Sequence, residues 1–363
     1  MQRTIIAIIS VRFTTITRYD PTKKMEASSG MRITKTNLFR KKFSSVLVFV
    51  TCLLLVMTLM PSPSAFSQEK EKEEISYDIA VSAISIAVTV KDKKGRYVTG
   101  LSKENFTIYE NDEEKKITYF SQDSDAPLSL TVLLDVSGSM DLQDKLDESK
   151  EALGYLIKYL LDPEDEISLL IFADGEVEVA LNFSKDKKRF LSLLEATEAY
   201  GQTALNDAVA VSPEFANRGG NEKRALLLIT DGIENDSEYS PEQAIEVARR
   251  VDIPIYTIGY KIPISEQYLK KYKSSPLVSP SSIVYSLKRF AYATGGKAFF
   301  TDEPSRMKLT LRKIVQEIGH QYILGFTSYK DPKNDYRKIR VVTSNKKYNV
   351  RTREGYYSGE IKD

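Results

Sequence analysis

The feature that most constrains this chain is a strand-like run that stops abruptly at an aspartate. Residues 130–134 (LTVLL) are mostly apolar and are followed by Asp135, Ser137 and Ser139. Such a run predicts a buried strand of a parallel sheet that ends in a polar loop. Gly138 gives the loop the freedom to curl. We therefore expect the chemistry of the protein in this loop.

Three oxygen-bearing side chains occupy alternate positions of the loop, so they can converge on one point. One carboxylate and two hydroxyls are hard oxygen ligands, which suit Mg²⁺ or Mn²⁺ and leave room for water and an external ligand. The alternative interpretation is that these side chains cap the helix expected from Leu142 onward. The loop by itself supports both interpretations equally.

Two later segments favour the metal. Thr203 precedes a helical pattern, and the apolar run 225–230 (ALLLIT) ends at Asp231. Ligands of open α/β sheets gather at the carboxyl ends of central strands. The predicted metal site therefore has five residues: Asp135, Ser137, Ser139, Thr203 and Asp231. Six nearby acidic residues are expected to be solvated or to cap backbone groups, and one of them, Asp207, is a candidate support for the site: Asp141, Asp144, Asp174, Asp207, Glu234 and Asp236.

These residues carry a resemblance to a known family. The D-x-S-x-S pattern of residues 135–139, Thr203, and the T-D-G of residues 230–232 resemble the metal-ion-dependent adhesion site of von Willebrand factor type A domains. The resemblance covers residues 126–320. It implies a doubly wound, mostly parallel, Rossmann-like sheet that binds one divalent cation, Mg²⁺ or Mn²⁺, directly or through water. It also implies a protein or peptide partner whose Glu or Asp completes the coordination.

Strand and helix patterns alternate through this region, which predicts a parallel sheet with right-handed crossovers. Residues 177–181 are expected to form an antiparallel edge strand. The other expected strands are 130–134, 167–172, 225–230, 255–260 and 297–300, and the expected helices are 142–160, 186–195, 241–251, 283–294 and 305–318. The insertion 261–282 is interpreted as a surface loop, with contact to an anionic partner as the alternative.

The two flanks read as strands without helices. Residues 76–122 are too few to bury a core alone, and residues 321–358 form a similar set. We expect them to pair into one small β-sandwich-like module in which the type A domain is inserted. The V-x-V-x-D-x-x-G-x-x-V-x-G-L pattern from Val88, with the closing R-x-G-Y-Y from Arg353, resembles secreted bacterial proteins related to von Willebrand factor type A.

The first 75 residues read as a leader. Residues 1–30 are interpreted as a mis-assigned extension, 31–67 as a signal peptide with an apolar core at 46–60, and 68–75 as a linker. We therefore expect an exported protein, in the periplasm, envelope or medium. An uncleaved N-terminal membrane anchor is the alternative. The only cysteine, Cys52, lies in the apolar core, so no disulfide is expected in the processed chain.

Charge and composition limit the function. Residues 1–67 hold ten basic and two acidic side chains, so the remainder carries 42 basic against 48 acidic, a net charge of −6 that argues against nucleic-acid binding. With one histidine, His320, no Ser/His/Asp set can be assembled. We predict a non-enzymatic binding or adhesion protein. The alternatives are a Mg²⁺-dependent haloacid-dehalogenase-like phosphatase, disfavoured because Ser137 stands where a second aspartate is needed, and a scaffold in envelope assembly.

Overall fold

The computed structural model describes residues 81–262, 280–329 and 335–358, which belong to one compact unit. The predicted extension, signal peptide and linker lie outside the described residues, as does most of the insertion 261–282. Within the described ranges, no helix is both long and apolar enough to cross a membrane.

A six-stranded sheet forms the centre of the α/β domain, with strand order β10-β9-β8-β5-β6-β7. Five strands are parallel and β7 pairs antiparallel to β6, as predicted for the edge. The strands are β5 (Leu128–Asp135), β6 (Glu166–Ala173), β7 (Glu176–Ser184), β8 (Lys223–Thr230), β9 (Ile255–Tyr260) and β10 (Ala298–Thr301). The predicted fold class is confirmed.

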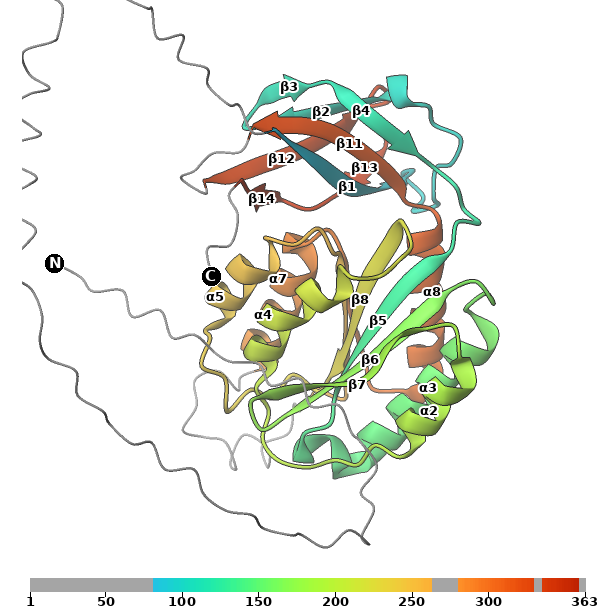
Figure 1. The fold of residues 1–363 in the computed structure, drawn as a ribbon, viewed down its shortest axis with the longest axis vertical. Coiled ribbons are helices and arrows are strands. Elements are labelled where there is room, and N and C mark those ends of the chain that lie inside the picture. The colour runs from blue at the N-terminus through green and yellow to red at the C-terminus, as the bar shows by residue number, and fades with distance from the viewer. Residues whose placement is uncertain (1–80, 263–279, 330–334, 359–363) are drawn as a thin grey trace, which may run out of the picture. The chain divides into compact units, whose positions relative to one another are not determined.

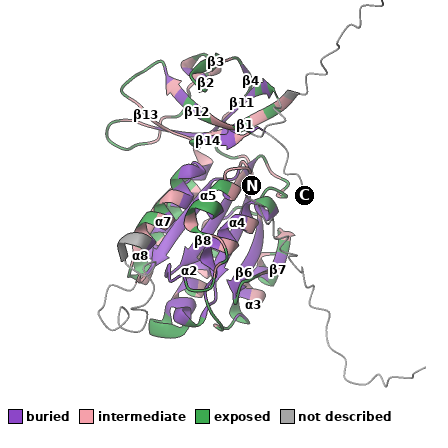
Figure 2. Cartoon of the chain, turned by 90° about the vertical axis from the view of Figure 1, so that its left-hand side faces the viewer, coloured by how far each residue is buried: buried purple, intermediate pink, exposed green. Residues whose placement is uncertain are grey.

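Helices cover both faces of this sheet (Figure 1). They are α2 (Lys145–Tyr159), α3 (Lys187–Glu195) and α8 (Pro304–Gly319) on one face, and α4 (Leu205–Ala216), α5 (Pro241–Ala248) and α7 (Pro280–Ala293) on the other. Because side chains of a strand alternate between faces, Val132 and Leu134 pack under the first group and Leu133 under the second. The four central strands, β5, β6, β8 and β9, are accordingly buried along almost all of their length (Figure 2).

The flanks form a sandwich of two four-stranded antiparallel sheets, ordered β13-β1-β11-β4 and β14-β12-β2-β3. Each sheet combines strands from both flanks, as the fold prediction requires: β1 pairs with β11 and β2 with β12. The strands are β1 (Val81–Lys91), β2 (Phe106–Glu110), β3 (Glu113–Lys115), β4 (Ile117–Ser121), β11 (Tyr322–Tyr329), β12 (Tyr336–Thr343), β13 (Asn349–Arg351) and β14 (Gly355–Tyr357). Ile86, Ile108 and Leu324 lie in their shared core.

One helix boundary differs from the prediction in a way that matters for the site. The helix expected from Leu142 begins at Lys145, and residues Gly138–Asp144 form a 3-10 segment, η2, with a kink. Leu142 is extended at ψ 133°, while Gln143 and Asp144 are left-handed at φ 60° and 55°. The helical spacing of apolar residues in the sequence does not reveal this kink, because the same spacing continues on both sides of it.

A buried carboxylate joins α8 to the β-sandwich. Glu317 is 1% exposed and accepts hydrogen bonds from Lys91 Nζ (2.9 Å) and the Tyr97 hydroxyl (3.3 Å), and it pairs with Arg351. Burial raises the pKa of Glu317, but Arg351 and Lys91 outweigh that effect and lower it overall. His320 stacks on Tyr97 with ring centroids 4.8 Å apart, so the single histidine has a structural place.

Candidate metal centre

The loop after β5 curls as its sequence predicts. Asp135 is fully buried, and its Oδ1 accepts hydrogen bonds from the Ser137 backbone N–H (2.9 Å) and hydroxyl (2.6 Å). The Ser137 and Ser139 hydroxyl oxygens lie 3.2 Å apart. Three of the five predicted ligands therefore form one connected group of oxygens.

A second carboxylate reaches this group from β8. Asp231 lies just beyond the end of β8 and is fully buried, and its charge acts on Asp135. Burial first, and then the Asp231 charge, raise the pKa of Asp135 to about 7, although hydrogen bonds from Ser137 and Thr230 oppose the rise. Two buried carboxylates that repel each other are stabilised by a nearby cation or by a proton on one of them.

Thr203 belongs to a loop that is bonded to the first one. The Tyr200 N–H donates to the Val136 carbonyl (2.8 Å), and the Gly138 N–H donates to the Gly201 carbonyl (3.0 Å). A Cβ atom at Gly138 would lie 3.3 Å from that carbonyl, so glycine allows the close approach. Thr203 is 1% exposed at this junction, and no hydrogen bond among the described residues joins its hydroxyl to the other four side chains.

Nearby acidic residues hold the loops together, in line with their predicted capping role. Asp174 accepts the Gln202 N–H (2.6 Å), and Asp207 accepts the backbone N–H groups of residues 238 and 239. Glu234 accepts the Asn206 N–H (2.9 Å), while the Asn235 side chain accepts the Thr203 N–H (2.8 Å). The bonds to the backbone of residues 202, 203 and 206 fix the loop around the predicted ligand Thr203.

The donor set fits a hard divalent cation. Two carboxylates and the hydroxyls of Ser137, Ser139 and Thr203 are oxygen donors of the kind that Mg²⁺ and Mn²⁺ bind. The part of the chain that the structure describes has no group of three or more Asp, Glu, His or Cys side chains placed to hold a metal. A cation at this site would therefore depend on hydroxyls as well as carboxylates.

Two neighbours of the site were absent from the predicted set. The Thr230 hydroxyl donates to Asp135 Oδ2 (2.6 Å), and Lys145 Nζ donates to Asp231 Oδ2 (2.7 Å). A signal for Lys145 existed in the sequence, since it occupies a position on the apolar face of α2. Thr230, the last residue of β8, gave no comparable signal.

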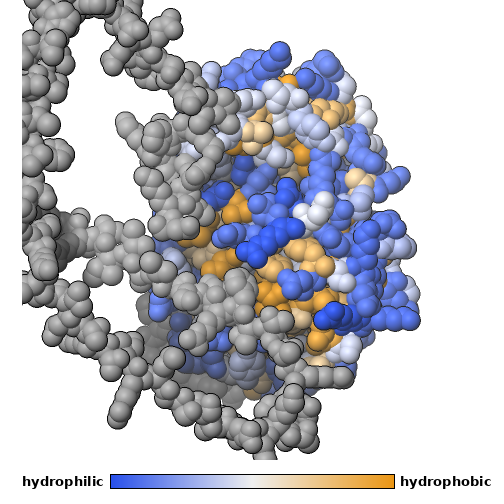
Figure 3. Space-filling view, in the orientation of Figure 1, coloured by the Kyte–Doolittle hydropathy of each residue, from blue (hydrophilic) through white to orange (hydrophobic). Residues whose placement is uncertain are grey.

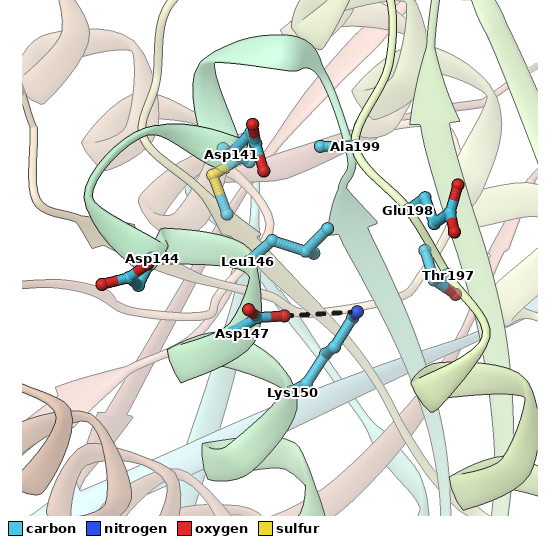
Figure 4. Close-up of a pocket in the computed structure, with 9 residues that line it drawn as sticks. Asp141, Asp144, Leu146, Asp147, Lys150, Thr197, Glu198 and Ala199 are labelled. Carbon is cyan, nitrogen blue, oxygen red and sulfur yellow. Dashed lines mark hydrogen bonds and ion pairs between the residues drawn. The ribbon is translucent and has the colours of Figure 1, made fainter.

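An acidic hollow of about 300 Å³ lies beside the site. Figure 4 shows Asp141, Asp144 and Asp147 from the η2–α2 segment on one side and Glu198 on the other. The ammonium of Lys150 bonds only weakly to Asp147, at 3.4 Å. This surplus of carboxylates gives the hollow a negative potential, which attracts cations.

Comparison with known proteins agrees with this geometry. Residues 130–234 match the family model described as von Willebrand factor type A domain. The α/β domain has the von Willebrand factor type A fold. The matched segment contains all five predicted ligands.

A relative of the chain is an uncharacterized protein of Borreliella burgdorferi, which is 25% identical over 168 residues. The match covers 44% of this chain and 47% of the relative, so it spans about half of that protein's length.

Three solved structures are similar to the chain. The BatB protein of Bacteroides thetaiotaomicron is 20% identical with a TM-score of 0.40, over 52% of this chain and 98% of that one. The vWF domain of the type V pili tip protein Mfa5 from Porphyromonas gingivalis is 13% identical with a TM-score of 0.43, over 53% and 95%. A von Willebrand factor type A protein from Catenulispora acidiphila is 14% identical with a TM-score of 0.43, over 76% and 62%.

Proposed function

We propose that the chain is an exported, metal-dependent binding protein that engages an acidic group of a protein or peptide partner. The observation that carries this proposal is the convergence of Asp135, Ser137, Ser139 and Asp231 at the carboxyl ends of two adjacent parallel strands. Asp135, Asp231 and the three hydroxyls, including that of Thr203, would hold Mg²⁺ or Mn²⁺. The cation would supply a positive charge for a partner's carboxylate.

The rim of the site offers surfaces for such a partner. Leu142, after the Ser139 loop, is 40% exposed, and Tyr200, before Thr203, is 45% exposed. Tyrosine is enriched in protein interfaces because it combines apolar area with a polar tip. Most of the outer edge in the space-filling view is hydrophilic, with hydrophobic residues gathered nearer the middle (Figure 3). Exposed apolar groups beside a charged centre favour a protein or peptide over a small ion.

A phosphatase has less support from the same atoms. Both oxygens of Asp135 accept hydrogen bonds from hydroxyls, those of Ser137 and Thr230. A phosphoryl-accepting aspartate needs a second carboxylic acid nearby for proton transfer, and Ser137 cannot serve as one near neutral pH.

Export is proposed on the apolar run 46–60 and the small residues that follow it. A scaffold role in envelope assembly is the alternative use of the same binding site.

The experiment is a capture assay from envelope extract. Immobilised protein is incubated with the extract in Mg²⁺ or in EDTA, and retained proteins are identified by mass spectrometry. The proposal predicts proteins that are retained in Mg²⁺, released by EDTA and lost with Asp135→Ala. An identical retained set under all three conditions would contradict it.

A further inference from the structure

A lysine lies inside the candidate metal centre. Lys145 is 1% exposed, and its Nζ donates to Asp231 Oδ2 (2.7 Å) and to the Ser139 carbonyl (3.2 Å). Lysine is almost never fully buried unless it is paired. Here it is paired with one of the two carboxylates predicted to hold the cation.

A bend in the backbone lies directly before Lys145. Gln143 and Asp144 both adopt the left-handed conformation, which residues other than glycine rarely take. The kink ends η2 and starts α2 at Lys145. Lys145 then shares the buried face of α2 with Leu146 and Ser149, and its side chain is directed to the end of β8.

The charges at the site explain what the ammonium does. Asp135 and Asp231 are both fully buried and repel each other. A buried charge without a partner is strongly unfavourable. One ammonium offsets half of the charge of the two carboxylates, so the pair can remain buried in the absence of a divalent cation.

We propose that Lys145 is the resident cation of this site: it holds Asp231 when no divalent cation is bound, and it weakens the affinity for the divalent cation. The inference rests on the proposed function, because it concerns the same metal. A divalent cation near Asp231 is repelled by the ammonium and competes with it for the carboxylate. Lys145 therefore determines the concentration of divalent cation at which the site becomes occupied.

The test is the affinity for Mn²⁺, measured by calorimetry on the full chain. Lys145→Met keeps an unbranched side chain, one heavy atom shorter, and removes its charge. The inference predicts that this variant binds Mn²⁺ about tenfold more tightly than wild type, equivalent to about 1.4 kcal/mol. The matched control is Lys158→Met, an exposed lysine on the same helix about 20 Å away, whose affinity should equal that of wild type.

The outcomes separate the inference from the proposed function. If wild type binds no Mn²⁺, the proposed function fails. If wild type binds Mn²⁺ and folded Lys145→Met binds it equally or more weakly, the inference is overturned, and Lys145 only positions Asp231. Should Lys145→Met be unfolded without metal, the inference predicts that Mn²⁺ restores its circular dichroism spectrum, because the added cation replaces the ammonium. Failure of saturating Mn²⁺ to restore the spectrum would overturn it.

Discussion

Removal of the buried carboxylate at Glu317 should destabilise the protein substantially. Glu317→Gln keeps the shape of the side chain but leaves Lys91 and Arg351 without their counter-ion. Loss of one partner from a buried ion pair costs about 3–5 kcal/mol. The two cations keep 23% and 25% of their side chains exposed, so water can partly compensate and the lower end, about 3 kcal/mol, is expected. At about 2–4 °C per kcal/mol, the melting temperature should fall by roughly 6–12 °C.

The assay is urea unfolding followed by circular dichroism, together with a thermal scan. The matched control is Glu354→Gln, which removes a carboxylate paired with Arg249 and Arg289. Glu354 is 41% exposed, so its ion pairs are screened and the control should lose no more than about 1 kcal/mol. If Glu317→Gln were as stable as this control, the buried cluster would contribute nothing beyond a surface ion pair, and the reasoning would be refuted.

Three further results are expected. Because the pKa of Glu317 is lowered in the folded protein, its stabilisation is present above the ordinary value of 4.5 and is lost as pH falls through the folded value; the stability gap between wild type and Glu317→Gln should hold above pH 4.5 and shrink as the pH falls below it, and a constant gap would contradict the assignment. A chain ending at Gly319 lacks β11–β14, so residues 81–121 should become sensitive to limited proteolysis while the α/β domain resists; equal protection in both chains would contradict the inserted arrangement. Purified protein with Mg²⁺ should not hydrolyse aryl phosphates above background, and turnover that disappears in Asp135→Asn would favour the phosphatase.

The layers of the fold could be predicted because they depend on patterns that a sequence shows directly. Mostly apolar runs such as 225–230 and 255–260 predicted the buried parallel strands, and helical periodicity predicted the covering helices. The pairing of the flanks followed from the size of each flank, since neither could bury a core alone.

The candidate site could be predicted only in part. Asp135, Ser137 and Ser139 share one loop, so their spacing was visible, and Asp231 followed from strand order. Lys145 was not predicted, although it lies on the apolar face of α2, because its contact with Asp231 depends on the left-handed backbone at Gln143 and Asp144. Thr230 was missed because its role is a hydrogen bond to a residue 95 positions away. Contacts set by tertiary geometry leave no periodic signal.

The central claim is that a divalent cation binds at Asp135, and titration calorimetry with Mn²⁺ tests it most directly. The account predicts about one ion bound per chain, with affinity reduced about 100-fold or more in Asp135→Ala, equivalent to about 2.7 kcal/mol or more, while the circular dichroism spectrum is unchanged. Asp141→Ala removes an exposed carboxylate beside the same site and should change the affinity less than about threefold, because exposed charges are screened. Equal Mn²⁺ affinity in wild type and folded Asp135→Ala would contradict the account.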